Sequence, residues 1–325
     1  MKIIQIMLCF SLLLSACIQA TQLSFTRQTQ AQQHLFHYQW LDHQNKKQAM
    51  SFTLSKTALF DRFRMLKTFN NDFAQKSILR GIKKQLTKQP LSGVQALFKQ
   101  INGKITIDLN SINEEKLPLA YQQVKKIEQT ETENYFKKYY YQYFIDHDNQ
   151  AGVKMNHIDI ANDSVADFKS LKNIILEKVS IKNIRRVTNY VLAFVQNIPY
   201  SSLKSRLSSS GAGFNPPAKL LWENQGDCDS KMTLTATLLR SLMPRIEMAM
   251  IFIDQHAFIG IAVQPLAGEI TVEDQGITYV LAEPTGPALY PLGILAPESA
   301  LAIEQGRYIV EAYHSDGSIG LSKGL

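Results

Sequence analysis

The spacing of hydrophobic and polar positions changes several times along the chain, and each change predicts a different element. Residues 35–54 contain two runs rich in aromatic and β-branched side chains, with a polar turn around residues 42–45 between them. This pattern predicts a β-hairpin. Apolar residues then recur at helical spacing, at Leu59, Phe63, Leu66, Phe69 and Phe73, and Ser55 can cap the helix that they predict. The stripe is more typical of a core-facing helix than of a binding face.

The middle of the chain predicts a helical piece near residues 94–99 and a short alternating strand at residues 105–109. Residues 114–145 are charged and mostly helix-forming, so we expect one long helix there. That segment ends in an aromatic cluster of Tyr135, Phe136, Tyr139, Tyr140, Tyr141, Tyr143 and Phe144. Seven aromatic side chains on adjacent turns cannot share one helix face, which favours packing between two domains over a platform for substrate. We place the domain boundary near residue 155.

Two amphipathic helices are expected after this boundary. The first is capped by Asp163 or Ser164 and runs through Lys178, and the second runs from a cap at Ser180 through Ile198. The apolar face of the second helix is suited to covering another element of the fold.

Residues 222–242 contain an almost unbroken apolar run, which follows the sequence Gly226-Asp227-Cys228-Asp229. A helix that is apolar on nearly all sides belongs inside a domain. Cys228 would stand at its N-terminal end, where unpaired backbone N–H groups favour a thiolate and lower the thiol pKa. The serine- and glycine-rich residues 208–213 just before it are expected to form a surface loop, with an active-site lid as the alternative.

Strand patterns follow the buried helix, at residues 246–253, 256–263, 269–272 and 277–282, with a turn at residues 274–276. A last strand at 307–313 is expected to add an edge. The short connections favour antiparallel neighbours. The sequence therefore predicts an α+β fold: an N-terminal α+β accessory domain at residues 21–155, and a domain at 156–325 in which the cysteine helix packs on an antiparallel sheet.

The first twenty residues are typical of an export signal. Lys2 precedes an apolar segment, Ile3 to Leu14, which is too short to count as a mature membrane span, and small residues follow it. Leu14-Ser15-Ala16-Cys17 also resembles the lipobox of bacterial lipoproteins, in which residues 1–16 are removed and Cys17 is acylated. Ordinary cleavage after Ala20 is the alternative. We expect an exported protein on the periplasmic side of a bacterial membrane, anchored through a lipid on Cys17.

The cysteine count makes Cys228 informative. The chain has 3 cysteines, of which Cys9 leaves with the signal and Cys17 is removed or acylated, so Cys228 is the one thiol of the mature protein. Oxidising compartments favour paired cysteines, so a single thiol indicates a functional residue. The alternative is an inert cysteine packed as a small hydrophobic residue.

Length and charge narrow the class of protein. The chain has 325 residues, 45% of them hydrophobic, which is enough for two modest domains with a real core. Its net charge of +7 comes largely from charged helices such as residues 56–88, a pattern that usually marks a solvated face. No motif typical of nucleic-acid binding is present in the sequence, and no nucleic-acid partner is expected.

Three residues in the second half can form a nucleophilic site. A cysteine nucleophile needs a base within reach and a group that orients the base. His256 opens one predicted strand and Glu283 closes another, so the two side chains converge on Cys228 if these strands are neighbours and their ends meet the start of the helix. The alternatives are a core histidine at 256 and Asp254 in the orienting role.

The motifs around these residues resemble a known family. The sequences GDCDSK from Gly226, QHAFIGIAV from Gln255 and YVLAEPTG from Tyr279, together with FVQNIPY from Phe194, resemble the transglutaminase-like superfamily. The similarity is to the bacterial transglutaminase-like cysteine peptidases, which include periplasmic proteases that release surface adhesins, and it covers roughly residues 165–290.

The resemblance implies a papain/transglutaminase-like core with Cys228 as nucleophile, His256 as general base and Glu283 as the orienting acid. The family usually has aspartate where this chain has Glu283. Members that cleave adhesins bind calcium through acidic neighbours of the cysteine. Asp227 and Asp229 match part of that pattern and Ser230 does not, so no cofactor is expected, with calcium near Asp227 and Asp229 as the alternative.

The implied chemistry is acyl transfer. The oxyanion would be held by the Cys228 backbone N–H and by a side-chain donor such as Gln196. We expect a cysteine peptidase or amidase that acts on a protein or peptide substrate of the cell envelope. A protein-crosslinking transglutaminase, or a non-catalytic envelope lipoprotein with a vestigial triad, are the alternatives.

Overall fold

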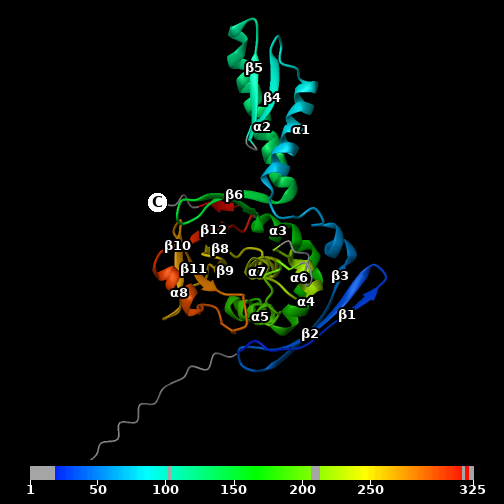
Figure 1. The fold of residues 1–325 in the computed structure, drawn as a ribbon. Helices are drawn as coiled ribbons and strands as arrows, with labels where there is room; N and C mark the ends of the chain where they lie inside the picture. Colours follow the sequence, from blue (N-terminus) through cyan, green and yellow to red (C-terminus); the bar gives the residue numbers. More distant parts are fainter. Residues whose placement is uncertain (1–18, 102–103, 206–212, 317–318, 322–325) are drawn as a thin grey trace, which may run out of the picture.

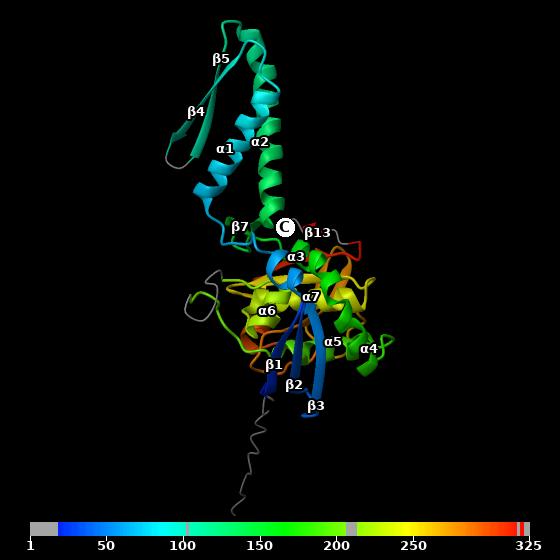
Figure 2. The same ribbon diagram turned by 90° about the vertical axis from the view of Figure 1, so that its right-hand side faces the viewer.

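The computed structural model describes residues 19–101, 104–205, 213–316 and 319–321. The chain forms a rounded body from which a slender arm, formed by residues 71–101 and 104–139, projects (Figures 1 and 2). Within the described residues the strands pair antiparallel in four separate sheets, and the predicted mixed α+β class is confirmed. The export signal with Cys17, and residues 208–212 of the predicted loop, lie outside the described residues. No helix in the described ranges has the length and apolar character needed to cross a membrane.

The predicted buried helix is confirmed as α7, Cys228–Leu242, which lies at the centre of the body (Figure 1). Every residue from Ser230 to Leu242 is buried. The elements that contact it are α3, His157–Ser164; the short helix η3, Val165–Phe168; α4, Lys169–Lys178; α5, Ile184–Gln196; α6, Pro217–Glu223; and strand β9. The core of the body is therefore built around this one helix.

A six-stranded antiparallel sheet covers one side of α7. Its order is β10-β11-β9-β8-β12-β13, with β8 at Met248–Ile253, β9 at His256–Ile261, β10 at Thr271–Asp274, β11 at Ile277–Ala282, β12 at Ile309–Tyr313 and β13 at Ile319–Leu321. The predicted strands and the turn between β10 and β11 are confirmed. The suggestion that residues 307–313 form an edge is wrong, because β12 pairs with β8 on one side and β13 on the other. Helix α8, Pro297–Glu304, which was not predicted, packs partly buried residues against the hydrophobic cluster of this sheet.

A second antiparallel sheet brings the N-terminal residues into the same core. It consists of β1, Gln22–Gln30; β2, Gln33–Leu41; and β3, Lys47–Ser55. The predicted hairpin corresponds to β2 and β3 and is confirmed. Alternate β2 residues Tyr38 and Trp40 are fully buried and pack against Phe194 of α5. The boundary near residue 155 stays a prediction, but residues 22–55 share the core of the body that holds α7.

The structure of residues 56–99 departs from the predicted helices. A π-helical turn, Thr57–Asp61, is followed by an irregular stretch, and only then does α1 begin, Asn71–Lys88. Ser55 does cap the first turn, since its Oγ accepts the Ala58 N–H at 3.1 Å. The predicted helix at residues 94–99 is wrong. Those residues form β4, Gln95–Ile101, because they pair along their length with β5, Lys104–Asn110.

The long predicted helix is shorter than expected. After a 3₁₀ turn, Glu114–Lys116, helix α2 spans Leu117–Tyr139, and Tyr140 ends it in the left-handed conformation with φ of 55°. The aromatic residues beyond it form β6, Tyr141–Ile145, paired with β7, Ala151–Met155, so the prediction of helix through residue 145 is wrong. A left-handed residue stops helical hydrogen bonding, and aromatic side chains suit a strand.

The helix caps also differ from the expected ones. The first helix after the arm is α3, capped by Asn156, and the chain reaches residue 178 through η3 and α4. Asn183, not Ser180, caps α5, because the Asn183 side chain accepts the Arg186 N–H at 3.0 Å. Serine and asparagine are equally good cap residues, so sequence alone does not choose between neighbours.

Candidate active site

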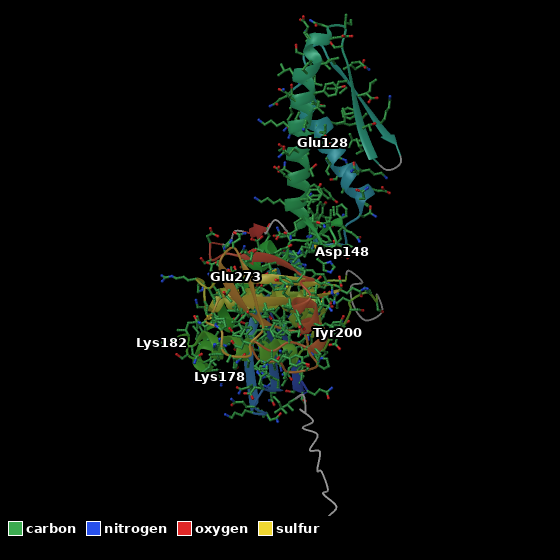
Figure 3. All side chains as sticks on the ribbon, turned by 90° about the vertical axis from the view of Figure 1, so that its left-hand side faces the viewer. Glu128, Asp148, Lys178, Lys182, Tyr200 and Glu273 are labelled. Carbon is green, nitrogen blue, oxygen red and sulfur yellow. The ribbon has the colours of Figure 1, made fainter. Side chains whose placement is uncertain are left out.

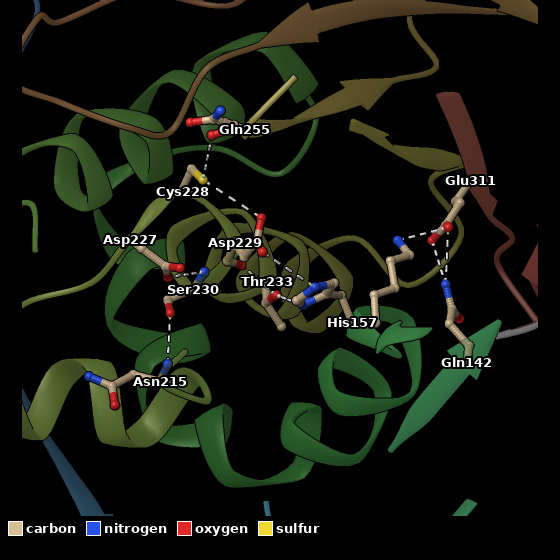
Figure 4. A network of polar contacts seen from close by, with 11 residues as sticks. Gln142, His157, Asn215, Asp227, Cys228, Asp229, Ser230, Thr233, Gln255 and Glu311 are labelled. Carbon is tan, nitrogen blue, oxygen red and sulfur yellow. Dashed lines mark hydrogen bonds and ion pairs between the residues drawn. The ribbon is translucent and has the colours of Figure 1, made fainter. Parts of the chain in front are cut away.

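Cys228 occupies the first position of α7 and is half-buried. The Asp227 side chain caps the helix by accepting the Ser230 N–H at 3.0 Å (Figure 4). The preceding Gly226 is tied to the chain before α6: its N–H donates to Pro199 O at 3.2 Å, and its carbonyl accepts the Ser201 N–H at 3.1 Å. A Cβ on Gly226 would come within 2.6 Å of the Leu220 side chain, so the turn that presents Cys228 needs glycine.

The six-stranded sheet brings His256 and Glu283 together. His256 is the first residue of β9, Glu283 directly follows β11, and the two strands are antiparallel neighbours with Ala282 opposite Ile259. The His256 Nε2 and Glu283 Oε1 atoms are 2.7 Å apart. Because a carboxylate only accepts, Nε2 carries the hydrogen of the neutral ring and Nδ1 is left as the basic nitrogen.

The sulfur of Cys228 lies beside the residue that precedes His256 and beside the next residue of its own helix. Its Sγ is 4.0 Å from the Gln255 carbonyl oxygen and 3.7 Å from Asp229 Oδ1 (Figure 4). Cys228 and His256 line one cavity of about 890 Å³. Within the described residues, no hydrogen bond joins the sulfur to the imidazole. The structure thus places the three predicted residues at one site, with the histidine and the carboxylate already paired.

The electrostatic surroundings of Cys228 differ from the expectation. Burial raises the pKa of the thiol well above its ordinary value, and the charges of Asp229 and Asp227 raise it further. Backbone N–H groups, including that of Ala257, act in the opposite direction without outweighing these effects. The predicted lowering of the pKa by the helix N-terminus is therefore wrong, and the resting sulfur is a thiol.

The two carboxylates beside the cysteine are a poor calcium site. Burial, and then the charge of Asp229, raise the pKa of Asp227 to about 6, and one oxygen of Asp227 is already used as the helix cap. In the part of the chain that the structure describes, no group of three or more histidine, cysteine or acidic side chains is placed to hold a metal. Calcium prefers six to eight oxygen ligands, so these residues do not fit it.

Gln196 does not occupy the expected oxyanion position. It is buried in α5, and its Nε2 donates to two carbonyl oxygens, those of Glu283 and Tyr290, each at 2.8 Å. Its Oε1 lies 3.1 Å from Nε2 of His43, in the turn between β2 and β3. With both amide hydrogens used, Gln196 has none for a substrate oxygen. It instead holds the loop that follows Glu283.

The same loop contacts the first described residues of the chain. The Ala20 N–H donates to Pro287 O at 2.6 Å, and Gln19 forms a β-bridge with Ala288. A Cβ on Gly286 would come within 2.3 Å of the Gln196 backbone oxygen. Close backbone contacts therefore fix the loop from two sides.

The Glu283 carboxylate is buried and fully bonded. Besides His256, it accepts the Ala296 N–H on Oε2 at 2.8 Å, and Ser299 Oγ is 3.4 Å from Oε1. Asp254, the alternative orienting residue, is instead paired with Arg307 and His147, with closest distances of 2.7 Å and 2.8 Å. Glu283, and not Asp254, is therefore the carboxylate that is bonded to His256.

Two cavity residues were missed by the sequence reasoning. His157 is buried, its Nδ1 is 3.1 Å from Thr233 Oγ1, and its Nε2 is 3.9 Å from Asp229 Oδ2 (Figure 4). Burial lowers the pKa of His157 to about 4, so this ring is neutral near pH 7. The His157 Nδ1–H donates to Thr233, because the Thr233 hydroxyl is committed to Asp229 O at 2.7 Å. Nothing in the sequence around His157 indicates that it lines the cavity beside Asp229.

The second missed residue is Tyr200, which lines the cavity and is more than half exposed at the surface of the body (Figure 3). Burial of the ring raises the pKa of its hydroxyl, and the charges of Asp227 and Asp229 raise it further. Tyr200 closes the FVQNIPY motif, so the sequence did contain a signal for it.

The far wall of the cavity comes from the base of the arm. It is lined there by Phe69, Tyr141, Phe144, Val153, Lys154 and Met155. Lys154 Nζ is 2.8 Å from Glu311 Oε1 of β12 and 3.2 Å from the centre of the Phe252 ring. A polypeptide that enters the cavity would therefore contact an apolar wall, in which the charge of Lys154 is balanced by Glu311.

Comparison of this chain with protein-family models, with curated proteins and with solved structures gives no significant match.

Proposed function

We propose that this protein is an exported, thiol-dependent acyl-transfer enzyme that acts as a cysteine peptidase or amidase. Cys228 is the nucleophile, His256 the general base and Glu283 the residue that orients the base. The observation that carries the proposal is the His256–Glu283 pair, 2.7 Å apart, at the cavity that also holds Cys228. A central helix that begins with cysteine and packs on an antiparallel sheet supports a core of the papain/transglutaminase-like type.

The raised pKa of Cys228 decides how the sulfur is activated. Since the resting group is a thiol, His256 removes its proton as the sulfur attacks a carboxamide carbon, instead of holding a preformed ion pair. Glu283 fixes the ring and stabilises the imidazolium that forms. The backbone N–H of Cys228, at the first position of the helix, is the oxyanion donor.

The second half of the reaction returns the proton. The imidazolium of His256 protonates the leaving amine, which departs and leaves a thioester on Cys228. A water molecule, deprotonated by His256, then attacks the thioester carbonyl and releases the acid. The substrate class is a protein or peptide of the cell envelope, and the enzyme reaches it from a lipid anchor on Cys17.

Acylation by a small ester tests this assignment without knowledge of the substrate. The protein is mixed with p-nitrophenyl acetate, and the acetyl thioester on Cys228 is followed by mass spectrometry. General base catalysis contributes about 100- to 10,000-fold, so His256→Ala should slow acylation by roughly that factor. Arg307→Ala, which removes an exposed ion pair outside the triad, is the matched control and should acylate at the normal rate. Equal rates in wild type and His256→Ala would reject the assignment.

A non-catalytic binding protein is the second candidate, because the acidic surroundings of Cys228 oppose thiolate formation. If the protein is a non-catalytic binding protein, acylation of Cys228 should be slow and His256→Ala should not change its rate. It also expects the same set of envelope proteins in cells with wild type and with Cys228→Ala, whereas a peptidase changes that set. In a reaction that does proceed, incorporation of a labelled primary amine separates amine transfer from hydrolysis.

A further inference from the structure

The arm is an element that the proposed chemistry does not use. It comprises residues 71–139: the antiparallel helices α1 and α2, with the β4–β5 hairpin lying on them (Figures 1 and 2). A small core of its own holds the outer half together, formed by Leu109, Ala120 and Val124 with partly buried neighbours.

The root of the arm is continuous with the cysteine cavity. At the base of α1 and α2, a hydrophobic cluster joins Ala74, Tyr135 and Phe136 to residues of β6 and β7. Four members of this cluster also line the cavity of Cys228: Phe69, Tyr141, Val153 and Met155. A polypeptide held on the arm is therefore positioned to enter the cavity along this wall.

A groove runs along the outer half of the arm between β5 and α2. Its volume is about 430 Å³, and it is lined by Ile105, Ile107, Tyr121, Gln122, Val124, Lys125 and Glu128. Glu128 marks the position of this groove on α2 in Figure 3. Half of the Tyr121 side chain is exposed at its rim. Apolar side chains at alternate positions of β5, with an aromatic ring beside them, are suited to an extended peptide.

The backbone of β5 offers a second means of binding. Among the described residues β5 has one strand neighbour, β4, so its other edge is not used by a strand. An open edge next to a groove accepts an additional strand through main-chain hydrogen bonds.

The charge of the arm indicates the chemistry of the partner. Residues 71–139 contain twelve lysine and arginine residues against seven acidic ones, a surplus of five positive charges out of a net +7 for the whole chain. A positive surface attracts a negatively charged partner and raises its rate of encounter.

We propose that the β5 edge and the adjoining groove bind an extended, acidic segment of the protein substrate, and that the arm delivers the chain that follows to Cys228. The inference rests on the proposed acyl-transfer function for its last step, but the binding step does not require catalysis.

Binding is tested with the full mature chain carrying Cys228→Ala, so that no probe is consumed. The probe is a short fluorescent peptide of alternating glutamate and valine, and a lysine–valine peptide of the same length is its control. Fluorescence anisotropy should show binding of the acidic peptide, and hydrogen exchange should show protection of residues 104–110. Tyr121→Ala and Lys125→Glu should each weaken binding roughly tenfold or more. Lys126→Glu, an equal charge change at an exposed position outside the groove, should weaken it less.

Several results would overturn the inference: no binding of the acidic peptide, equal binding of the lysine peptide, or equal loss with Lys126→Glu and Lys125→Glu. Binding of anionic vesicles in place of the peptide would assign the arm to a membrane surface and also overturn it. The two proposals fail separately. If the protein binds the peptide but wild type is not acylated at Cys228, the binding role of the arm stands and the acyl-transfer function is rejected. If wild type is acylated but the peptide does not bind, the acyl-transfer function stands and the binding role of the arm is rejected.

Discussion

At the scale of single residues, Glu283 shows how a longer acid fits where the resemblance leads one to expect aspartate. Both of its oxygens are bonded, Oε1 to His256 and Oε2 to the Ala296 N–H. The additional methylene is therefore matched by a backbone donor on the far side of the carboxylate. This geometry supports an active site in which the histidine ring is held firmly.

Glu283→Gln tests that arrangement. The amide keeps the shape but cannot stabilise the imidazolium, so acylation of Cys228 should fall by roughly 100-fold or more. With Glu283→Asp the acylation rate should fall less, because the shorter side chain keeps the negative charge but lies farther from His256. Asp254→Asn is the control, because Asp254 bonds to Arg307 and His147 and not to His256. A rate with Glu283→Gln within a few-fold of wild type would show that Glu283 does not assist the base.

Lys231 makes a separate prediction about stability. It is fully buried in α7, its Nζ donates to the Ile198 carbonyl, and burial lowers its pKa to about 7. The unfolded chain holds this proton up to its ordinary pKa of about 10.4, so between these values unfolding takes up a proton and stability rises with pH. Below pH 7 both states are protonated and the penalty for burying the charge is complete.

The measurement is the free energy of unfolding in denaturant for wild type and Lys231→Met. Between pH 6 and pH 8.5 the wild type should gain about 2 kcal/mol relative to Lys231→Met, the linkage expected for the cited shift. The same substitution at the surface lysine Lys182 should leave the difference from wild type constant with pH. A constant difference for Lys231→Met as well would mean that the buried amine stays protonated in the folded state.

At the scale of elements, the sequence predicts best where one periodicity runs without interruption. Helix α7 and strands β8 to β11 were predicted because their apolar runs are continuous and end at turn residues. Strand β4 was not predicted because residues 95–101 are held as a strand by pairing with β5, and the sequence of a short segment does not show which segment it pairs with. The aromatic residues after Tyr140 were assigned to a helix because the left-handed conformation that ends α2 falls on a tyrosine, which carries no such signal.

In the candidate site, too, the features set by local sequence were predicted and those set by distant contacts were not. Cys228, His256 and Glu283 were found because each lies where a predicted element begins or ends. The position of Gln196 could not be predicted, because its hydrogen-bond partners, Tyr290 and His43, come from distant parts of the chain. The raised pKa of Cys228 was missed because the effects of burial and neighbouring carboxylates exceed that of the helix terminus, and only coordinates allow that comparison.

The loop after Glu283 should depend on Gln196. Gln196→Leu removes the two hydrogen bonds to the Glu283 and Tyr290 carbonyls and leaves these buried oxygens without donors, which costs about 1–3 kcal/mol each. We expect a lower melting temperature and a slower acylation of Cys228 as Glu283 loses its support. Gln39→Leu, an exchange of the same size at a partly exposed β2 position, is the control. Unchanged acylation by a stably folded Gln196→Leu would show that the loop does not position the acid.

At the scale of the whole molecule, the N-terminal sheet is part of the body that carries the site. Trp40 is almost completely buried and packs on Tyr190 and Phe194 of α5. Trp40→Ala should lower the free energy of unfolding by about 3–5 kcal/mol, the usual range for a large core residue. It should also shift the unfolding transition of α7, which hydrogen exchange of the α7 backbone amides can report.

Phe73→Ala is the matched control for that change, since Phe73 lies on the arm with 64% of its side chain exposed and should cost little. If Trp40→Ala melted the N-terminal sheet while the rest of the body unfolded as in wild type, residues 22–55 would be a separate folding unit.

The contact between Ala20 and Pro287 has a consequence for how the molecule would stand on a membrane. Ile18 alone separates Cys17 from Gln19, which is already paired with Ala288, so an acyl chain on Cys17 would leave almost no slack. Strand β1 begins at the end of the body opposite the arm (Figures 1 and 2). Such an anchor would hold the body close to the bilayer with the arm pointing away from the lipid, so that polypeptides would be bound on the side away from the membrane.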